Sequence, residues 1–296
     1  MQSALKVPLQ KRIRSSAVLF LVSAIWGSSY VVQRIAASHY DPFMFNGIRF
    51  LVASLLLLLL NKFSLRYSKQ ELVYVIFAGI LLFLSVGLQQ IGLAYTTAGN
   101  AGFLSGLYVV FVPILVFVIW RNKILLVNWI ASILALAGFY MLSAQAGFTF
   151  NPGDVYEVIG ALIWAVYVIL LSKLPTNIKV LNFAVGQYAV CGLMSLIIAS
   201  FSYTKGDLVN NDYAWTIIFT AVFPVAVGLS LQIYGQKYTK AVEAALILSM
   251  ETIFAAGFGW LFLEEILNPI QFLGCGLILS AIILSQISSY KKENKN

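Results

Sequence analysis

One acidic residue, Glu251, stands in the middle of a long apolar stretch of the sequence. Counted from Lys240 at about 1.5 Å per residue, it lies roughly two to three helical turns inside an apolar segment. An unpaired charge at that depth costs at least about 2.5–3.5 kcal/mol, so the carboxylate must pair, take up a proton or face water. Because burial disfavours the charged form, Glu251 could couple transport to protons or hold a substrate ammonium group. A structural carboxylate, hydrogen-bonded between helices, is the alternative.

Arg49 is the expected counter-charge to this carboxylate, one to two turns inside another apolar segment. Its guanidinium could bind a substrate carboxylate through two parallel hydrogen bonds. It could equally be a structural residue that caps neighbouring helix ends or extends its charge towards the membrane surface. The sequence leaves both roles open.

Two pairs of aromatic residues occupy equivalent places in the chain. Trp26 and Trp164 match under a shift of 138 residues, with Tyr30 four residues after the first and Tyr167 three after the second. Residues three or four apart share one face of a helix. Two such faces could line a cavity and stack on a substrate or a cation. Packing, or an aromatic belt at the membrane interface, is the alternative.

A shift of about 143 residues aligns further polar side chains. It places Gln89 on Gln232 and Tyr108 on Glu251. Buried amides need hydrogen-bond partners, so the two glutamines either line a cavity or bond between helices. Tyr108 becomes a candidate lining residue by its match to Glu251.

The same shift aligns Asn100 with Glu243, close to the starts of two segments, where solvated helix caps are expected. Pro113 and Pro224 lie inside segments and remove backbone hydrogen bonds. We predict them as hinges, with tolerated helix curvature as the alternative.

These residues lie in a chain of 296 residues that is 60% hydrophobic and only 10% charged, against about 25% charged in soluble domains. A helix needs roughly 20 apolar residues to cross a bilayer. The segments are continuous and lack the alternation of barrel strands, which favours helices. The sequence therefore predicts an all-α integral membrane protein with ten transmembrane helices, at 16–37, 43–60, 72–94, 98–119, 125–145, 155–173, 180–202, 213–236, 242–263 and 268–288.

The ten segments form two units of five, related by the shifts described above. Because five is odd, the second unit must lie inverted in the membrane relative to the first. Inverted repeats around a site at the membrane midplane are typical of secondary transporters. The expected organisation is an N-terminal tail (1–15), a first repeat (16–145), a second repeat (146–288) and a C-terminal tail (289–296).

The net charge is +8, and the positions of the basic residues indicate how the chain is oriented in the membrane. Most of the 19 Lys and Arg residues fall at segment ends on the side of the N-terminus, whereas Arg34 and Lys205 fall on the other side. The positive-inside rule then places both termini in the cytoplasm, in the inner or plasma membrane. The expected partners are the lipid bilayer and a small-molecule substrate, not nucleic acid, and the protein is expected as a monomer or homodimer.

The sequence carries few groups for catalysis. It has one histidine, His39, no H-E-x-x-H motif and no P-loop. Its two cysteines, Cys191 and Cys275, lie far apart without metal-ligand spacing. We therefore predict no catalytic residues, no metal and no cofactor, which makes an intramembrane enzyme an unfavoured alternative.

Several motifs, in order along the chain, resemble the EamA family of the drug/metabolite transporter superfamily. They are AIWGSSYVV, FNGIRFLVASLLLL, GLAYTTAGNAGFL, GDVYEVIGALIWAVYVIL and AALILSMETIFAAGFGWLFLEEILNPIQFLG. The resemblance covers about Ser15 to Ser288; the family usually has Glu-Pro where this chain has Glu251-Thr252. It implies two EamA units, ten helices, and transport of small metabolites by alternating access, without fixing the substrate.

The combined prediction is a secondary active transporter that exports or exchanges small polar metabolites such as amino acids. A drug or lipophilic-cation efflux pump is the alternative. Glu251 is the expected proton-coupling residue, since it is the only acidic residue that these boundaries place deep in a span. The predicted substrate-binding cavity between the halves is lined by Trp26, Tyr30, Gln89, Tyr108, Trp164, Tyr167, Gln232 and Glu251.

Overall fold

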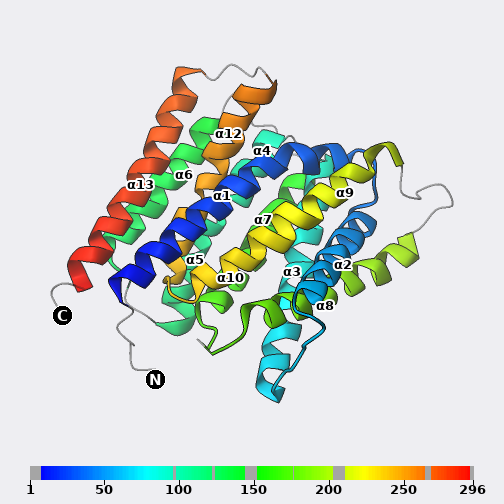
Figure 1. Cartoon of the computed structure of the whole chain (residues 1–296). Coiled ribbons are helices and arrows are strands. Elements are labelled where there is room, and N and C mark those ends of the chain that lie inside the picture. Colours follow the sequence, from blue (N-terminus) through cyan, green and yellow to red (C-terminus); the bar gives the residue numbers. More distant parts are fainter. Residues whose placement is uncertain are drawn as a thin grey trace.

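The computed structural model describes residues 8–95, 98–121, 124–143, 152–175, 177–202, 211–263 and 268–293, which contain helices and no strand (Figure 1). The helices of the first half are α1 (Leu9–Ala37), α2 (Pro42–Leu60), α3 (Lys69–Tyr95), α4 (Ala98–Ser105), α5 (Tyr108–Trp120) and α6 (Leu126–Ser143). Those of the second half are α7 (Pro152–Ser172), α8 (Val180–Ser202), η2 (Asn211–Tyr213), α9 (Ala214–Thr220), η3 (Ala221–Leu229), α10 (Ser230–Gln236), α11 (Ala241–Leu248), α12 (Met250–Leu263) and α13 (Pro269–Glu293).

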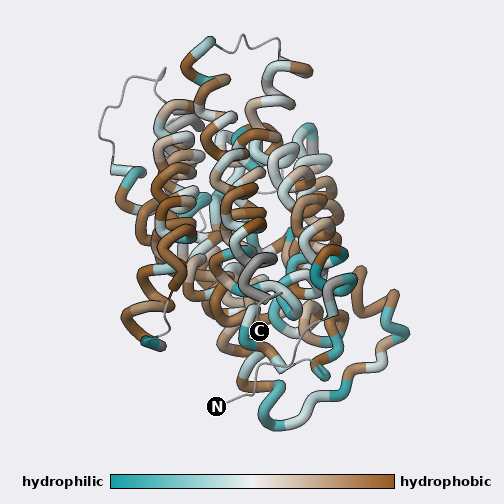
Figure 2. Tube along the Cα trace, turned by 90° about the vertical axis from the view of Figure 1, so that its left-hand side faces the viewer, coloured by the Kyte–Doolittle hydropathy of each residue, from teal (hydrophilic) through white to brown (hydrophobic). Residues whose placement is uncertain are grey.

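These helices make up ten crossings. Within the described part of the chain, nine helical spans are long and apolar enough to cross a membrane, and Leu126–Leu142 is a shorter apolar helix. Large apolar side chains such as Leu60, Val73 and Phe201 are exposed on the outside of the bundle. Figure 2 shows hydrophobic residues along the helices and hydrophilic residues gathered near the end where both termini lie. The prediction of an all-α integral membrane fold is confirmed.

The two halves interlock instead of forming separate lobes. α2 packs on α8, α3 on α7, and α6 on α13, so that each of these pairs joins the first half to the second. α1 likewise packs on α12 and α10 of the second half. The α6–α13 pair forms one edge of the bundle (Figure 1). The interior is therefore built from both repeats at once.

Two crossings carry a short helix irregularity at equivalent places. The first is a turn at Gly106–Leu107, between α4 and α5, and the second is a turn at Ser249, between α11 and α12. The shift of 143 residues relates these two turns. Leu107 and Ser249 keep right-handed helical backbone angles, so each crossing runs through its turn as one span. Tyr108 follows the first turn directly, and Glu251 lies two residues after the second.

The predicted hinge prolines lie in two different backbone settings. Pro113 is inside α5, which continues past it, and the turn in that crossing comes earlier, at Gly106–Leu107. Pro224 lies inside η3, a π-helical stretch of nine residues. π-Helical turns are rare and occur frequently at functional sites. The hinge roles of both prolines stay predictions.

The first helix starts earlier than the predicted boundary at residue 16. α1 begins at Leu9, so that Arg12 is part of the helix. The Arg12 guanidinium lies 2.6 Å from the Glu243 carboxylate at the start of α11, and both side chains are buried. The expectation that Glu243 is a solvated helix cap is therefore wrong, because Arg12 supplies a buried counter-charge. The side chain of Asn100, its match in the first repeat, lies outside the described set.

Candidate functional site

A cavity of about 90 Å³ lies in the interior between the two halves. Both repeats contribute to its walls, through α1, α2, α3 and the α4–α5 crossing on one side and α7, η3 and α12 on the other. Its lining combines aromatic, amide, hydroxyl and charged side chains in an otherwise apolar bundle. They are Trp26, Ser29, Tyr30, Gln33, Arg49, Phe50, Ser85, Gln89, Ser105, Tyr108, Glu157, Trp164 and Glu251.

The structure brings six of the eight predicted lining residues together around this cavity: Trp26, Tyr30, Gln89, Tyr108, Trp164 and Glu251. The other two do not line it. Tyr167 is fully buried behind Trp164, and its hydroxyl donates to Gln187 Oε1 at 3.2 Å. Gln232 is fully buried, and its amide has no hydrogen-bond partner among the described residues. A substrate-binding role stays a prediction for all eight.

Glu251 is held in the first turn of α12, two residues after the turn at Ser249. Its side chain is buried, and the Tyr30 hydroxyl donates to its Oε1 over a long distance of 3.5 Å. The same hydroxyl lies 3.4 Å from Ser105 Oγ at the end of α4. Tyr30 therefore connects the α4–α5 crossing of the first half to the carboxylate of the second half.

Arg49 enters the cavity from α2 and is also buried. Its Nη1 donates to Gln33 Oε1 at 3.0 Å, and Gln33 Nε2 donates to Ser29 Oγ at 3.1 Å. The guanidinium also lies over the ring of Phe45 at 4.7 Å from the centroid. Its Nε has no hydrogen-bond partner among the described residues. The structure thus gives Arg49 a structural use, and binding of a substrate carboxylate by Arg49 stays a prediction.

The two tryptophans meet across the repeat boundary. The rings of Trp26 and Trp164 pack edge to face with centroids 5.6 Å apart. The indole of Trp26 donates to the carbonyl of Pro224 at 3.2 Å, inside the π-helical stretch. Gly228 makes this approach possible, because a Cβ built there would lie 2.7 Å from Trp26 Nε1. The ring of Trp26, which lines the cavity, is therefore hydrogen-bonded to the π-helical backbone of η3.

A second carboxylate borders the same cavity, and the sequence analysis missed it. Glu157 lies on α7 and is 1% exposed. It falls near the start of the predicted span 155–173, where a wet environment is expected. Its position seven residues before Trp164 places both on one helix face, and that spacing was the signal that could have identified it.

The cavity can therefore bind a small polar molecule. Two carboxylates and several aromatic rings can hold a cationic group, whereas Arg49 can accept an anionic one. Water-sized molecules fit a cavity of this volume, but drug-sized ligands occupy pockets of about 300–1,000 Å³.

Comparison with known proteins agrees with the resemblance in the motifs. The model of the EamA-like transporter family matches residues 14–144 and again 151–286. An uncharacterized transporter of Archaeoglobus fulgidus is 35% identical over 275 residues, covering 93% of this chain and 86% of its own. The uncharacterized inner membrane transporter YedA of Escherichia coli is 25% identical over 279 residues, covering 92% of this chain and 90% of its own.

A solved crystal structure superimposes with a TM-score of 0.79 over 95% of this chain and 99% of its own. At 13% identity, this match supports the fold alone. The two family matches together span nearly all of the ten crossings. The chain is a multi-pass membrane protein that belongs to the EamA-like transporter family.

Proposed function

We propose that the protein is a secondary active transporter that moves a small polar metabolite across the membrane by alternating access. The observation that carries the proposal is the polar cavity between the two inverted repeats, with the carboxylate of Glu251 in its lining. A site near the interface of inverted repeats can be exposed to either side by rocking one repeat against the other. Glu251 is the proposed group that loads and releases a proton during this cycle.

The size and lining of the cavity favour a small polar substrate over a large lipophilic one. Its volume of about 90 Å³ is far below that of drug-sized sites. Arg49 and the two carboxylates offer both charge signs to one substrate, as an amino acid would require. Efflux of lipophilic cations remains the second candidate, supported by the rings of Trp26 and Trp164.

Flux into proteoliposomes that contain the purified full chain tests this function. We expect an imposed proton gradient to drive uptake of at least one member of an amino-acid and amine panel above protein-free liposomes. Competition by amino acids would support the first candidate, and competition by tetraphenylphosphonium the second. A chain that moves neither class under a proton gradient, nor exchanges it against itself, would contradict the transporter proposal.

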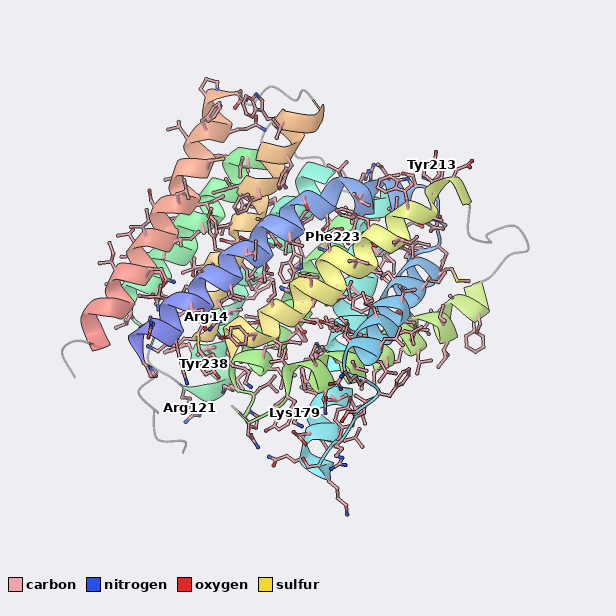
Figure 3. All side chains as sticks on the ribbon, viewed as in Figure 1. Arg14, Arg121, Lys179, Tyr213, Phe223 and Tyr238 are labelled. Carbon is pink, nitrogen blue, oxygen red and sulfur yellow. The ribbon has the colours of Figure 1, made fainter. Side chains whose placement is uncertain are left out.

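We also propose that both termini face the cytoplasm. Figure 3 shows Arg14, Arg121 and Lys179 towards the end of the bundle where the termini lie, and Tyr213 at the opposite end. This clustering of basic residues supports that orientation through the positive-inside rule.

Cysteine labelling in intact cells checks the orientation. In a background without Cys191 and Cys275, we expect His39→Cys to react with an impermeant maleimide. Lys179→Cys should react only after permeabilisation. Both positions are exposed in the structure, so that access depends on the side of the membrane. Labelling of Lys179→Cys in sealed cells would reverse the proposed topology.

A further inference from the structure

The carboxylate of Glu157 is buried with no hydrogen-bond partner. Both of its oxygens are inaccessible, and neither is paired within the described residues. No Lys, Arg or His side chain of the described part of the chain forms an ion pair with it. A buried carboxylate without a partner costs several kcal/mol unless it is compensated. Some other contribution must therefore account for its presence beside the cavity.

Packing does not account for Glu157, because the other repeat contains the same contact without a charge. A Cβ built on Gly92 of α3 would lie 2.6 Å from Glu157 Oε1. A Cβ built on Gly235 of α10 would lie 2.8 Å from Leu19 Cδ2. Gly92 matches Gly235 under the shift of 143, and Glu157 matches Leu19 under the shift that relates Trp164 to Trp26. Leucine fills this position in the first repeat, so the fold itself does not need an acid there.

The neighbours of Glu157 are those of a cation site. Trp164 lies two turns further along the same helix face and also borders the cavity. Its ring packs against Trp26, and the Tyr30 hydroxyl donates to Glu251 Oε1 at 3.5 Å. Asp154 lies one turn before Glu157 on the same helix. Carboxylates beside exposed aromatic faces recognise ammonium groups by charge and by cation–π attraction.

We propose that Glu157 is a specificity-determining residue that binds the ammonium group of the substrate at this cavity. The proposal rests on the transporter function and names its substrate class as small molecules that carry an ammonium group. Glu251 then keeps the separate task of proton coupling, and the two acids are not equivalent. Glu157 receives the substrate cation against the tryptophan pair, in the one repeat that replaces leucine by glutamate.

Binding to the full chain in lipid nanodiscs tests this role. The probes are ethanolammonium and choline, with ethylene glycol and 3,3-dimethylbutanol as their neutral isosteres. Quenching of intrinsic tryptophan fluorescence and the shift in melting temperature report occupancy. We expect both cations, and neither neutral isostere, to bind the unmodified chain. In Glu157→Gln the affinity for the cations should fall by about 10–100-fold, since charge-assisted hydrogen bonds are worth about 1.5–3 kcal/mol.

Two further variants separate recognition from folding. Glu157→Leu installs the residue that the first repeat carries, and it should melt no lower than the unmodified chain while losing the cations. Glu71→Gln removes a partly exposed acid at the start of α3, outside the cavity, and should leave the affinity unchanged. The absence of cation binding to the unmodified chain, or equal affinities in Glu157→Gln and Glu71→Gln, would overturn the proposal.

Flux measurements distinguish this proposal from the transporter function on which it rests. If the unmodified chain binds the cations through Glu157 but moves nothing, the transport proposal fails and the subsite stands. If the chain transports and Glu157→Gln retains cation affinity while fewer protons move per substrate, Glu157 is a second proton carrier and the specificity role is wrong.

Discussion

Glu251→Gln is expected to abolish accumulation driven by a proton gradient while the chain still folds. The amide has nearly the same shape as the acid and can still accept a hydrogen bond from Tyr30. It cannot change its charge, so it cannot load a proton on one side of the membrane and release it on the other. In proteoliposomes, accumulation under an imposed pH gradient should fall to the level of protein-free liposomes. Exchange of substrate without a gradient should persist.

The control for this result is Glu71→Gln, which removes a partly exposed acid outside the cavity. It should keep full dependence on the pH gradient. If Glu251→Gln also keeps it, Glu251 is a structural carboxylate, and facilitated diffusion or obligate exchange becomes the better mechanism. If Glu251→Gln loses exchange together with accumulation but melts normally, Glu251 binds the substrate directly.

Gly274→Ala is expected to cause a large loss of stability at the α6–α13 edge of the bundle. A Cβ at Gly274 would lie 2.7 Å from the carbonyl oxygen of Gly138, and one at Gly138 would lie 2.6 Å from that of Gly274. These contacts are with backbone atoms, so no side-chain rotation relieves them. Overpacking of this kind typically costs about 1–3 kcal/mol. Thermal unfolding in nanodiscs should show the loss as a lower melting temperature.

Gly276→Ala is the matched control on the same helix. Nothing lies within 4 Å of a Cβ built at Gly276, and alanine is favoured over glycine in a helix by about 0.8–1 kcal/mol. This variant should therefore melt at the same temperature as the unmodified chain or slightly higher. Equal melting temperatures for the two variants would show that α6 and α13 do not cross closely at Gly138 and Gly274 in the membrane.

The sequence predicted the crossings well because hydrophobic length is a strong local signal. α8 has the predicted bounds 180–202, and the α4–α5 crossing starts at the predicted residue 98. The predicted start of α1 was too late, because Arg12 lies before the apolar stretch and was assigned to the N-terminal tail. Its counter-charge, Glu243, is distant in the sequence. The average hydrophobicity of a short sequence window cannot detect an ion pair between residues so far apart.

The site was predictable only in part, because the rotation of each helix about its axis is set by packing. Trp26 and Trp164 line one cavity, as the repeat symmetry suggested. Gln89 and Gln232 match in the sequence, yet only Gln89 borders the cavity. Glu157 was not predicted as a site residue, because its close packing depends on Gly92, which lies on another helix, α3. The exposure of one helix face cannot be read without the helix that covers it.

The buried pair of Arg12 and Glu243 has a consequence for how the chain is made. Its two members are 231 residues apart, so at about 5–20 residues per second the ribosome delivers Glu243 roughly 12–46 s after Arg12. During that interval α1 lacks both α10 and α12, its partners in the second half. Newly inserted chains therefore spend this time before the contact between Arg12 and Glu243 can form, and a truncated first half would never form it.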